Sequence, residues 1–305
     1  MKIKLIGIIY TWMKYLRNQI FKSNRYKLTK RIIRHIESGD CDFPVEEKTA
    51  MKRFLSSTLV SQISYPFIKE YRYRIVNVLW DNTKSLYYVY RHKKKLYFKS
   101  GISKTKIRNS YNELCIEQDR RSPHSYFSFP VNYQPDDIAV DLGAAEGIWA
   151  LDIVEKVREV YLFECEDCWI EALQATFEPW KDKVHIVNKY VSDFTDEKNT
   201  TLDDYFYKEN IYPDIIKVDV EGAEIACMKG ASKLLTHSVR HILLCTYHNY
   251  SDYTALSEIM KNHHYEVQPS EGRMIAIYSE PDYGCTDITQ IFRKGLIHAY
   301  KQKST

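Results

Sequence analysis

A glycine-containing turn with an acid in front of it is the first stretch of the chain that could bind a nucleotide. Residues 138–142 have the pattern of a buried strand, and the turn that follows runs from Asp141 to Gly147 with another glycine at Gly143. Glycine adopts backbone conformations that other residues resist and lets a ligand approach closely. A dinucleotide fingerprint would place glycine at Ala145, and the carboxylate of Asp141 would repel a pyrophosphate. The turn therefore favours a different nucleotide ligand.

Two further acidic stretches are expected at the same edge of the fold. Glu164 follows the strand-like run 160–163 and lies roughly 20 residues beyond Gly143, the spacing at which a carboxylate accepts hydrogen bonds from ribose hydroxyls. Residues 215–220 form another strand-like run. Its end and the turn after it carry three acids, Asp219, Glu221 and Glu224. Acids here suit a ligand with a sulfonium and an ammonium group. The sequence therefore predicts S-adenosylmethionine as the cofactor.

The pattern of elements predicts how these residues are positioned. After Pro135, apolar strand-like runs alternate with helical stretches, which is typical of parallel strands joined by crossover helices in a doubly wound α/β sheet. The expected strands and helices are 138–142, 148–157, 160–163, 169–177, 184–187, 215–220, 226–235, 242–246 and 253–262. The runs 265–267, 273–278 and 292–300 are expected to close the sheet as antiparallel strands. Ligands of such sheets bind at the carboxyl ends of the strands.

The region before the sheet has a different character. Helical patterns at 44–71 and 104–121 flank strand-like runs at 74–80, 86–91 and 96–99, which predict a small antiparallel meander. We expect three parts: a basic arm at 1–35, an accessory α+β region at 36–131, and a Rossmann-like sheet domain at 132–305.

Charge and cysteine content narrow the class of protein. Residues 1–34 hold ten Lys and Arg and no acid, whereas the rest of the chain has 34 bases against 40 acids, which argues against a nucleic-acid groove on the main domain. Seven cysteines without framework spacing indicate free thiols and a cytoplasmic location. The only C-x-x-C, Cys165 with Cys168, lacks a second pair of ligands, so we expect no metal site.

The basic arm has the pattern of an amphipathic helix. Its apolar residues repeat at helical spacing from Leu5 to Ile20, with basic residues on the other face. The apolar run is too short to span a bilayer. Two interpretations stay open: residues 1–30 contact the inner membrane surface peripherally, or the helix caps the rest of the protein.

The motifs together resemble those of the FkbM family of methyltransferases, a class I S-adenosylmethionine-dependent group. The stretches that carry the resemblance lie between residues 136 and 250 and read DLGAAEG at 141–147, VYLFE at 160–164, IVNKYVSD at 186–193, TLDDYF at 201–206, IIKVDVEGAE at 215–224 and MKGASKLL at 228–235. The resemblance implies a seven-stranded sheet and O-methylation of a sugar or another small hydroxylated metabolite.

The resemblance also implies roles for single residues. The turn residues Asp141, Gly143, Ala144 and Gly147 would hold the methionine part of the cofactor, and Glu164 the ribose. Asn188 and Lys189 would lie near the adenine, and Asp219 near the reactive methyl group. One departure stands out, because the family tends to have an acid two residues before the histidine of Thr246-Tyr247-His248.

Methyl transfer to a hydroxyl requires alignment and a proton acceptor. His248 is the candidate base, because it closes a strand beside the acidic stretch and histidine titrates near neutral pH. Asp219 and Glu221 are the alternative base, or could hold a divalent cation that polarises the hydroxyl. For contacts to the acceptor we expect Tyr247 and, from the region before the sheet, Glu117, His124 and Tyr126.

Two other functions compete with this interpretation. An NAD-dependent oxidoreductase is disfavoured by Ala145 and by the lack of a suitably placed Tyr-x-x-x-Lys pair. A non-catalytic binding or scaffold subunit with the methyltransferase fold would explain the missing acid before His248.

Overall fold

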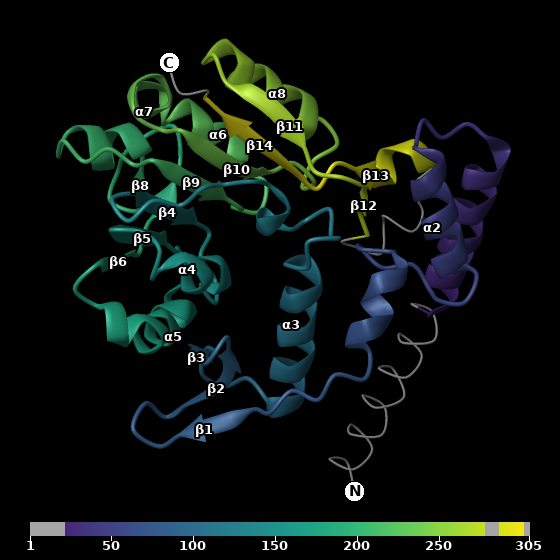
Figure 1. Cartoon of the computed structure of the whole chain (residues 1–305), viewed down its shortest axis with the longest axis horizontal. Helices are drawn as coiled ribbons and strands as arrows, with labels where there is room; N and C mark the ends of the chain where they lie inside the picture. Colours follow the sequence, from purple (N-terminus) through teal and green to yellow (C-terminus); the bar gives the residue numbers. More distant parts are fainter. Residues whose placement is uncertain (1–21, 278–286, 302–305) are drawn as a thin grey trace, which may run out of the picture. The chain divides into compact units, whose positions relative to one another are not determined.

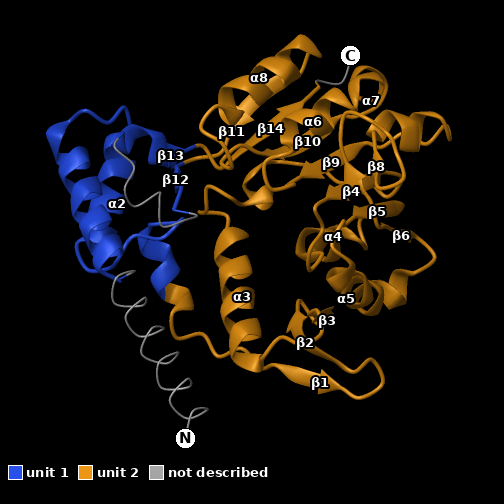
Figure 2. Cartoon of the chain, turned by 180° about the vertical axis from the view of Figure 1, so that it is seen from behind, with its two compact units in different colours: residues 1–69, 272–293 blue, residues 70–271, 294–305 orange. Residues whose placement is uncertain are grey.

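The computed structural model describes residues 22–277 and 287–301 and divides the chain into two compact units (Figure 2). Unit 1 comprises residues 1–69 and 272–293, and unit 2 comprises residues 70–271 and 294–305. These limits differ from the boundaries that the sequence suggested at residues 35 and 131. The meander and the helix after it belong to the same unit as the large sheet, and the meander packs on two of the helices that follow strands of this sheet.

Unit 2 is built on a seven-stranded sheet, as the sequence predicts (Figure 1). In spatial order its strands are β11 (Glu266–Pro269), β14 (Leu296–Tyr300), β10 (His241–Cys245), β9 (Ile215–Val218), β4 (Ile138–Leu142), β5 (Glu159–Phe163) and β6 (Val184–Val187). β14 runs antiparallel to both of its neighbours, and the pairs from β10 to β6 are parallel. The Rossmann-like α/β fold is thereby confirmed.

Helices connect the parallel strands and bury their apolar sides against the sheet. They are α4 (Ile148–Ile153), α5 (Asp167–Phe177), α6 (Glu224–Lys229), α7 (Ser232–His237) and α8 (Asp252–Asn262). One continuous cluster of buried side chains joins Val140 and Leu142 of β4 to residues of α6, α7 and α8. The helix expected at 226–235 is broken at Gly230, where an added Cβ would lie 2.1 Å from the carbonyl oxygen of Ser192. The close approach of this second segment explains the break.

The meander consists of β1 (Leu79–Asp81), β2 (Leu86–Arg91) and β3 (Lys94–Tyr97), all antiparallel. α3 (Lys104–Glu117) follows it, and the Ser103 hydroxyl caps this helix by accepting from the backbone N–H of Lys106. A buried ion pair joins the meander to α4, because Arg91 Nε donates to both carboxylate oxygens of Asp152 at 2.8 and 2.9 Å. The Tyr97 N–H also donates to the Thr176 hydroxyl of α5 at 3.0 Å.

Short elements complete the description. β7 (Tyr190–Val191) pairs with β8 (Asn199–Thr200) in parallel, and β12 (Met274–Ile275) pairs with β13 (Phe292–Arg293) antiparallel. The 3-10 segments are η1 (Pro66–Tyr71), η2 (Tyr126–Ser128), η3 (Glu178–Trp180) and η5 (Ile288–Ile291), and η4 (Asp203–Tyr207) is a π-helical turn. The prediction that 273–278 closes the large sheet is therefore wrong for the residues that the structure describes, because β12 pairs with β13 in unit 1.

Unit 1 contains a helix over residues 22–38 and α2 (Val45–Leu55). The Thr29 hydroxyl accepts from the Val60 N–H at 3.0 Å, and the Glu47 carboxylate accepts from Tyr65 and Arg273 at 2.9 and 2.8 Å. The amphipathic pattern from residue 5 to residue 20 lies outside the described residues. Within residues 22–277 and 287–301, no helix is both long enough and apolar enough to span a membrane.

The buried ion pair of Arg91 and Asp152 should contribute strongly to the stability of unit 2. Both side chains are about nine-tenths buried, with 9% exposed, so Asp152→Asn leaves an uncompensated charge. We expect the free energy of unfolding to fall by about 3 kcal/mol in urea denaturation. The exposed pair of Lys208 and Asp204 serves as the control, because Lys208→Gln should cost about 0.5 kcal/mol or less. Equal effects of the two substitutions would contradict the structural role of the buried pair.

Candidate active site

The turn after β4 packs directly on the end of β9. Gly143 has φ of 72°, and a Cβ at this position would lie 1.8 Å from the backbone oxygen of Asp219. The backbone N–H groups of Gly143 and Ala144 donate to the carbonyl oxygen of Phe163 at 3.0 and 3.1 Å. A side chain at Gly143 would separate these segments, so the glycine lets the ends of β4, β5 and β9 meet at one edge.

The Glu164 carboxylate lies at this edge and is fixed by two backbone groups. Its Oε2 accepts from the N–H of Ala145, and its Oε1 accepts from the N–H of Glu166, both at 2.8 Å. The side chain is largely buried and lines the cavity described next. Each oxygen of a carboxylate can accept more than one hydrogen bond, so Glu164 keeps acceptor capacity for a ligand.

A cavity of about 500 Å³ lies at the carboxyl ends of the strands. It is lined by Gly143, Ala145, Phe163, Glu164, Cys165, Glu166, Trp169, Lys189, Tyr190, Val191, Asp219, Val220, Glu221 and Ala223. Four carboxylates and one ammonium group therefore face it, together with several aromatic rings. Of the residues predicted to bind the cofactor, Gly143, Glu164, Lys189 and Asp219 lie in this lining.

Asp141 is placed differently from the prediction. Its side chain is only 1% exposed, and its Oδ1 lies 2.8 Å from the Nζ of Lys217, its register partner on β9. The carboxylate expected to meet the ammonium group of the cofactor thus meets an ammonium group of the protein. A buried lysine needs such a partner, because an unpaired charge is costly away from water. The sequence analysis did not assign Lys217 to the site. Its charge within an otherwise apolar strand was the one feature that could have indicated a buried partner.

Three other predicted cofactor residues also lie outside the cavity lining. Gly147 begins α4 with φ of 75°, and a Cβ there would lie 2.7 Å from the ring of Phe177, so this glycine serves helix packing. Asn188 is directed to Asp167, to which its Nδ2 donates at 2.5 Å. Ala144, within the turn itself, is buried. For these residues direct contact with a ligand in the cavity is not supported.

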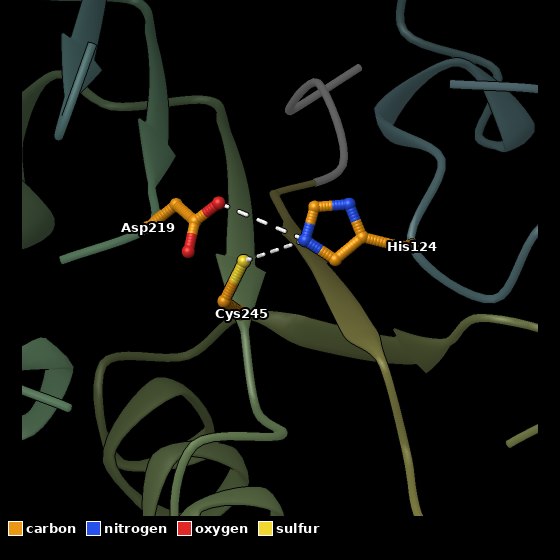
Figure 3. Close-up of side chains that lie close together, drawn as sticks. All are labelled: His124, Asp219 and Cys245. Atoms are coloured by element: carbon orange, nitrogen blue, oxygen red, sulfur yellow. Dashed lines mark hydrogen bonds and ion pairs between the residues drawn. The ribbon is translucent and has the colours of Figure 1, made fainter. Parts of the chain in front are cut away.

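Side chains from two segments, residues 124–126 and 245–247, surround the carboxylate of Asp219. Tyr126 donates its hydroxyl to Oδ2 at 2.8 Å, and Tyr247 donates to Oδ1 at 3.4 Å. The Nε2 of His124 lies 3.7 Å from Oδ2 and 3.3 Å from the Tyr247 hydroxyl. The thiol of Cys245 lies 3.8 Å from the same ring nitrogen of His124 (Figure 3). The structure thus brings together three of the predicted acceptor-binding residues around Asp219.

The charges around Asp219 determine its ionisation and that of His124. Burial alone would raise the pKa of Asp219, but Lys217, the two histidines and the hydrogen bond from Tyr126 lower it to about 2. Burial lowers the pKa of His124 to about 4, against the attraction of Asp219. At neutral pH the site therefore holds an ionised Asp219 beside a neutral His124.

His248 is held between carboxylates. Its Nδ1 lies 2.9 Å from Oε1 of the buried Glu224, and its Nε2 lies 3.7 Å from Oδ1 of Asp219 and 3.4 Å from Glu221. Burial alone would lower the pKa of His248, but hydrogen bonds and charges from these acids raise it to about 10. The ring is therefore protonated at neutral pH and cannot accept a proton there, which corrects the prediction of His248 as the base.

Glu224 was expected at the acidic edge, but the sequence prediction gave it no separate role in binding or catalysis. It was visible as the third acid of the stretch after β9, and its Oε1 accepts from the N–H groups of Val220 and Gly222 at 3.1 and 3.3 Å. The acid missing two residues before His248 is not needed as the partner of this ring. The Thr246 hydroxyl instead donates to the carbonyl oxygen of Lys294 at 2.9 Å.

Glu117 at the end of α3 faces the same group of acids. Burial and the charges of Asp219, Glu146, Glu113 and Glu221 raise its pKa to about 8. A carboxyl group with this pKa is mostly protonated at neutral pH and can donate a hydrogen bond. The structure therefore allows Glu117 to contact a polar acceptor group, as the sequence suggested.

A family model and several solved structures are similar to the chain. The family model described as "Methyltransferase FkbM domain" matches residues 170–284. Residues 170–284 are thus similar to an FkbM methyltransferase domain. The matched residues include Asp219 and His248, whereas the turn from Asp141 to Gly147 lies before them. No curated protein matches the chain.

Solved structures of methyltransferases are similar to the chain at low identity. The methyltransferase FkbM of Methylobacillus flagellatus has 17% identity and a TM-score of 0.46. The match covers 65% of this chain and 56% of that one. The precorrin-6y C5,15-methyltransferase of Geobacter metallireducens has 14% identity and a TM-score of 0.37, with 55% of this chain and 82% of that one covered. TrmK of M. capricolum, solved with S-adenosyl-homocysteine, has 10% identity and a TM-score of 0.35, with 56% and 64% covered. This chain thus spans little more than half of the Methylobacillus protein.

Gly143→Ala should prevent the methyltransferase domain from forming its cavity. The added Cβ would collide with the Asp219 backbone, so we expect affinity for S-adenosylmethionine to fall at least about tenfold in isothermal titration. Gly101→Ala is the matched control, because Gly101 has φ of 75° but nothing within 4 Å of an added Cβ. This control should lose only about 1 kcal/mol of stability and keep its affinity. Similar losses of affinity in both variants would contradict the close approach at Gly143.

The charge of His248 in the methyltransferase domain should appear as a pH dependence of stability. Its folded pKa is raised from 6.5 to about 10, so its contribution is fully present below pH 6.5 and is lost as the pH rises through 10. The difference in free energy of unfolding between wild type and His248→Gln should shrink over this range. In NMR titrations of the ring, Glu224→Gln should lower the pKa more than Glu221→Gln, since the Glu221 side chain is 89% exposed. A wild-type ring that titrates near 6.5 would refute the ion pairing.

Proposed function

We propose that this methyltransferase transfers the methyl group of S-adenosylmethionine to a hydroxyl oxygen of a sugar, a glycan precursor or another small hydroxylated metabolite. The charge of the cavity is the observation that carries the proposal, because four carboxylates and a single ammonium group line it. A ligand with sulfonium and ammonium charges suits such a lining. A dinucleotide does not, because its pyrophosphate would face the same carboxylates, and this argues against an NAD-dependent oxidoreductase.

The residues present fit the proposed cofactor. Glu164 has both oxygens oriented by backbone N–H groups and keeps acceptor capacity, which suits the two hydroxyls of a ribose. The aromatic rings of Trp169 and Phe163 and the side chain of Lys189 lie in the same lining and suit the adenine end. Asp219 and Glu221 lie on the β9 side of the lining and suit the cationic end.

S-adenosylmethionine, when bound, supplies an electrophilic methyl group on a sulfonium sulfur. The chain must then align an acceptor oxygen and receive its proton. Asp219 is the group suited to both tasks, because it stays ionised, and Tyr126 fixes one of its oxygens. His248 is charged at neutral pH, so we assign it the orientation of Asp219 rather than the acceptance of the proton.

The groups around Asp219 support a hydroxylated acceptor. Tyr126, Tyr247 and His124 present polar atoms beside aromatic rings, and Glu117 is protonated at neutral pH and able to donate. Polar atoms combined with aromatic faces are the usual means of recognising a sugar. These four residues are the proposed contacts of the acceptor.

Two substitutions should separate cofactor binding from the methyl-transfer step. Glu164→Gln should raise the Kd for S-adenosylmethionine about tenfold in isothermal titration, because the neutral amide is a weaker partner of hydroxyl donors. Asp219→Asn should lower kcat about 100-fold in a radiolabelled methyl-transfer assay over glycan and metabolite extracts. Glu171→Gln, an exposed acid on the same helix as Trp169, should change neither quantity.

The same measurements discriminate between the alternatives. Binding of NAD without binding of S-adenosylmethionine would refute the proposal. Binding of S-adenosylmethionine with no methylated product from any extract would favour a non-catalytic binding subunit. Mass spectrometry of a labelled product would identify the methylated atom and test whether it is oxygen.

A further inference from the structure

Three side chains with metal-ligating atoms converge beside the cavity (Figure 3). They are the imidazole of His124, the carboxylate of Asp219 and the thiol of Cys245, and their ligand atoms all lie within 4.8 Å of one another. His124 Nε2 is 3.7 Å from Asp219 Oδ2 and 3.8 Å from Cys245 Sγ. Dashed lines in Figure 3 show that both contacts involve the same ring nitrogen.

The separations are close to those of a tetrahedral site. Bonds of about 2.0–2.3 Å from zinc to nitrogen, oxygen and sulfur place the ligand atoms of a tetrahedron about 3.3–3.7 Å apart. Within this range a nitrogen–oxygen pair is expected at about 3.4 Å and a nitrogen–sulfur pair at about 3.6 Å. The measured separations of 3.7 and 3.8 Å exceed these values by a few tenths of an ångström at most. Binding a metal ion would therefore require only small side-chain shifts.

The fold holds the three residues firmly in this arrangement. Asp219 directly follows β9 and Cys245 ends β10, and these strands are adjacent and parallel. The segment of His124 is packed closely on the chain before β14, since a Cβ at Gly295 would lie 2.1 Å from the Pro123 oxygen. His124 is 3% exposed and Cys245 is fully buried. Asp219 and Cys245 are thus positioned by two adjacent strand ends, and His124 by a buried turn just before η2.

The two neighbouring cationic groups, Lys217 and His248, are paired with carboxylates other than Asp219. Lys217 is paired with Asp141 at 2.8 Å and also donates to the carbonyl oxygens of Leu142 and Gly143, so its three N–H donors have partners apart from Asp219. The charge of His248 is opposed by Glu224 at 2.9 Å. Lys217 and His248 thus have nearer carboxylate partners than Asp219, which is the carboxylate grouped with His124 and Cys245.

A second group of potential ligands, Asp219, Glu224 and His248, does not have the same geometry. Glu224 contacts Nδ1 of the His248 ring, whereas Asp219 contacts Nε2. The two nitrogens point in different directions, so one ion cannot replace both contacts. This group is better described as an ion-pair chain that orients Asp219.

We propose that His124, Asp219 and Cys245 form a binding site for a divalent transition metal ion of the zinc type. A mixed set of nitrogen, oxygen and thiolate ligands favours zinc over magnesium or calcium, which prefer oxygen ligands alone. On binding, the Cys245 thiol releases its proton to solvent and the sulfur bonds to the metal. Three protein ligands leave a fourth position for water or for an oxygen of the acceptor, as in catalytic zinc sites.

Two tyrosine hydroxyls act as partners of the ligands without a metal ion. Tyr126 lies 2.8 Å from Asp219 Oδ2 and 3.3 Å from Cys245 Sγ, and Tyr247 lies 3.3 Å from His124 Nε2. In the metal-bound state they would remain beside the ligands and hydrogen-bond to them or to the fourth ligand. Such outer contacts typically orient the ligands of a metal ion.

Cobalt(II) is a suitable probe, because a bound thiolate gives a charge-transfer band and a four-coordinate ion gives strong visible bands. We expect the full chain, free of any histidine tag, to show both bands at one equivalent of cobalt(II), and zinc(II) to displace them. Cys245→Ser should abolish the charge-transfer band, and His124→Gln should raise the Kd for cobalt(II) at least about 100-fold. Circular dichroism would establish that both variants are folded.

Two other cysteines provide matched controls. Cys227→Ser alters a thiol that is as fully buried as Cys245 but donates to the Val191 carbonyl oxygen, and it should leave the bands unchanged. Cys168→Ser removes an exposed thiol and should also have no effect. Absence of a one-equivalent band in the wild type, or a charge-transfer band that survives Cys245→Ser, would overturn the proposal. Metal binding is measured without cofactor or acceptor, so its failure would leave the proposed methyl transfer untouched.

Discussion

The buried ammonium group of Lys217 is the interaction on which the candidate site depends. It lies in the centre of the sheet on β9, opposite Asp141 on β4, and donates to the carbonyl oxygens at the start of the glycine turn. The ion pair joins the two strands side chain to side chain, while the lysine also holds the turn in place. An ion pair in this position tolerates no missing partner, because either charge alone would be buried without compensation.

The arrangement of charges follows from this pair. With Lys217 committed to Asp141, and His248 to Glu224, Asp219 remains the centre of the site and is surrounded by hydroxyls and a neutral imidazole. Its low pKa keeps it ionised, so it can attract a cationic ligand or accept a hydrogen bond over a wide pH range. The proposed cofactor site and the proposed metal site therefore share one residue but use different neighbours.

Much of the fold could be predicted from periodicity. β4 and β6 begin and end where the apolar runs indicated. β4 is fully buried, as is typical of parallel strands that read as nearly continuous apolar stretches, whereas β6 is a half-buried edge strand. The prediction failed where a distant segment decided the outcome. The helix at 226–235 breaks at Gly230 because the backbone of Ser192 packs there, and the run at 273–278 pairs with β13 instead of the sheet. Neither partner is visible from local pattern.

For the site, the sequence by itself determined which residues stand at the strand ends and that the edge is acidic, since parallel strands must present their carboxyl ends together. Only the tertiary structure decided which charge meets which. Asp141 faces Lys217 and not the cavity, His248 is paired with Glu224 and thus protonated, and Cys245 meets His124. Pairing of this kind depends on distances of a few ångströms between segments remote in the chain. The pairing of charges and the convergence of potential ligands therefore depend on the packed fold. The placement of residues at strand ends is already encoded in the apolar pattern of the sequence.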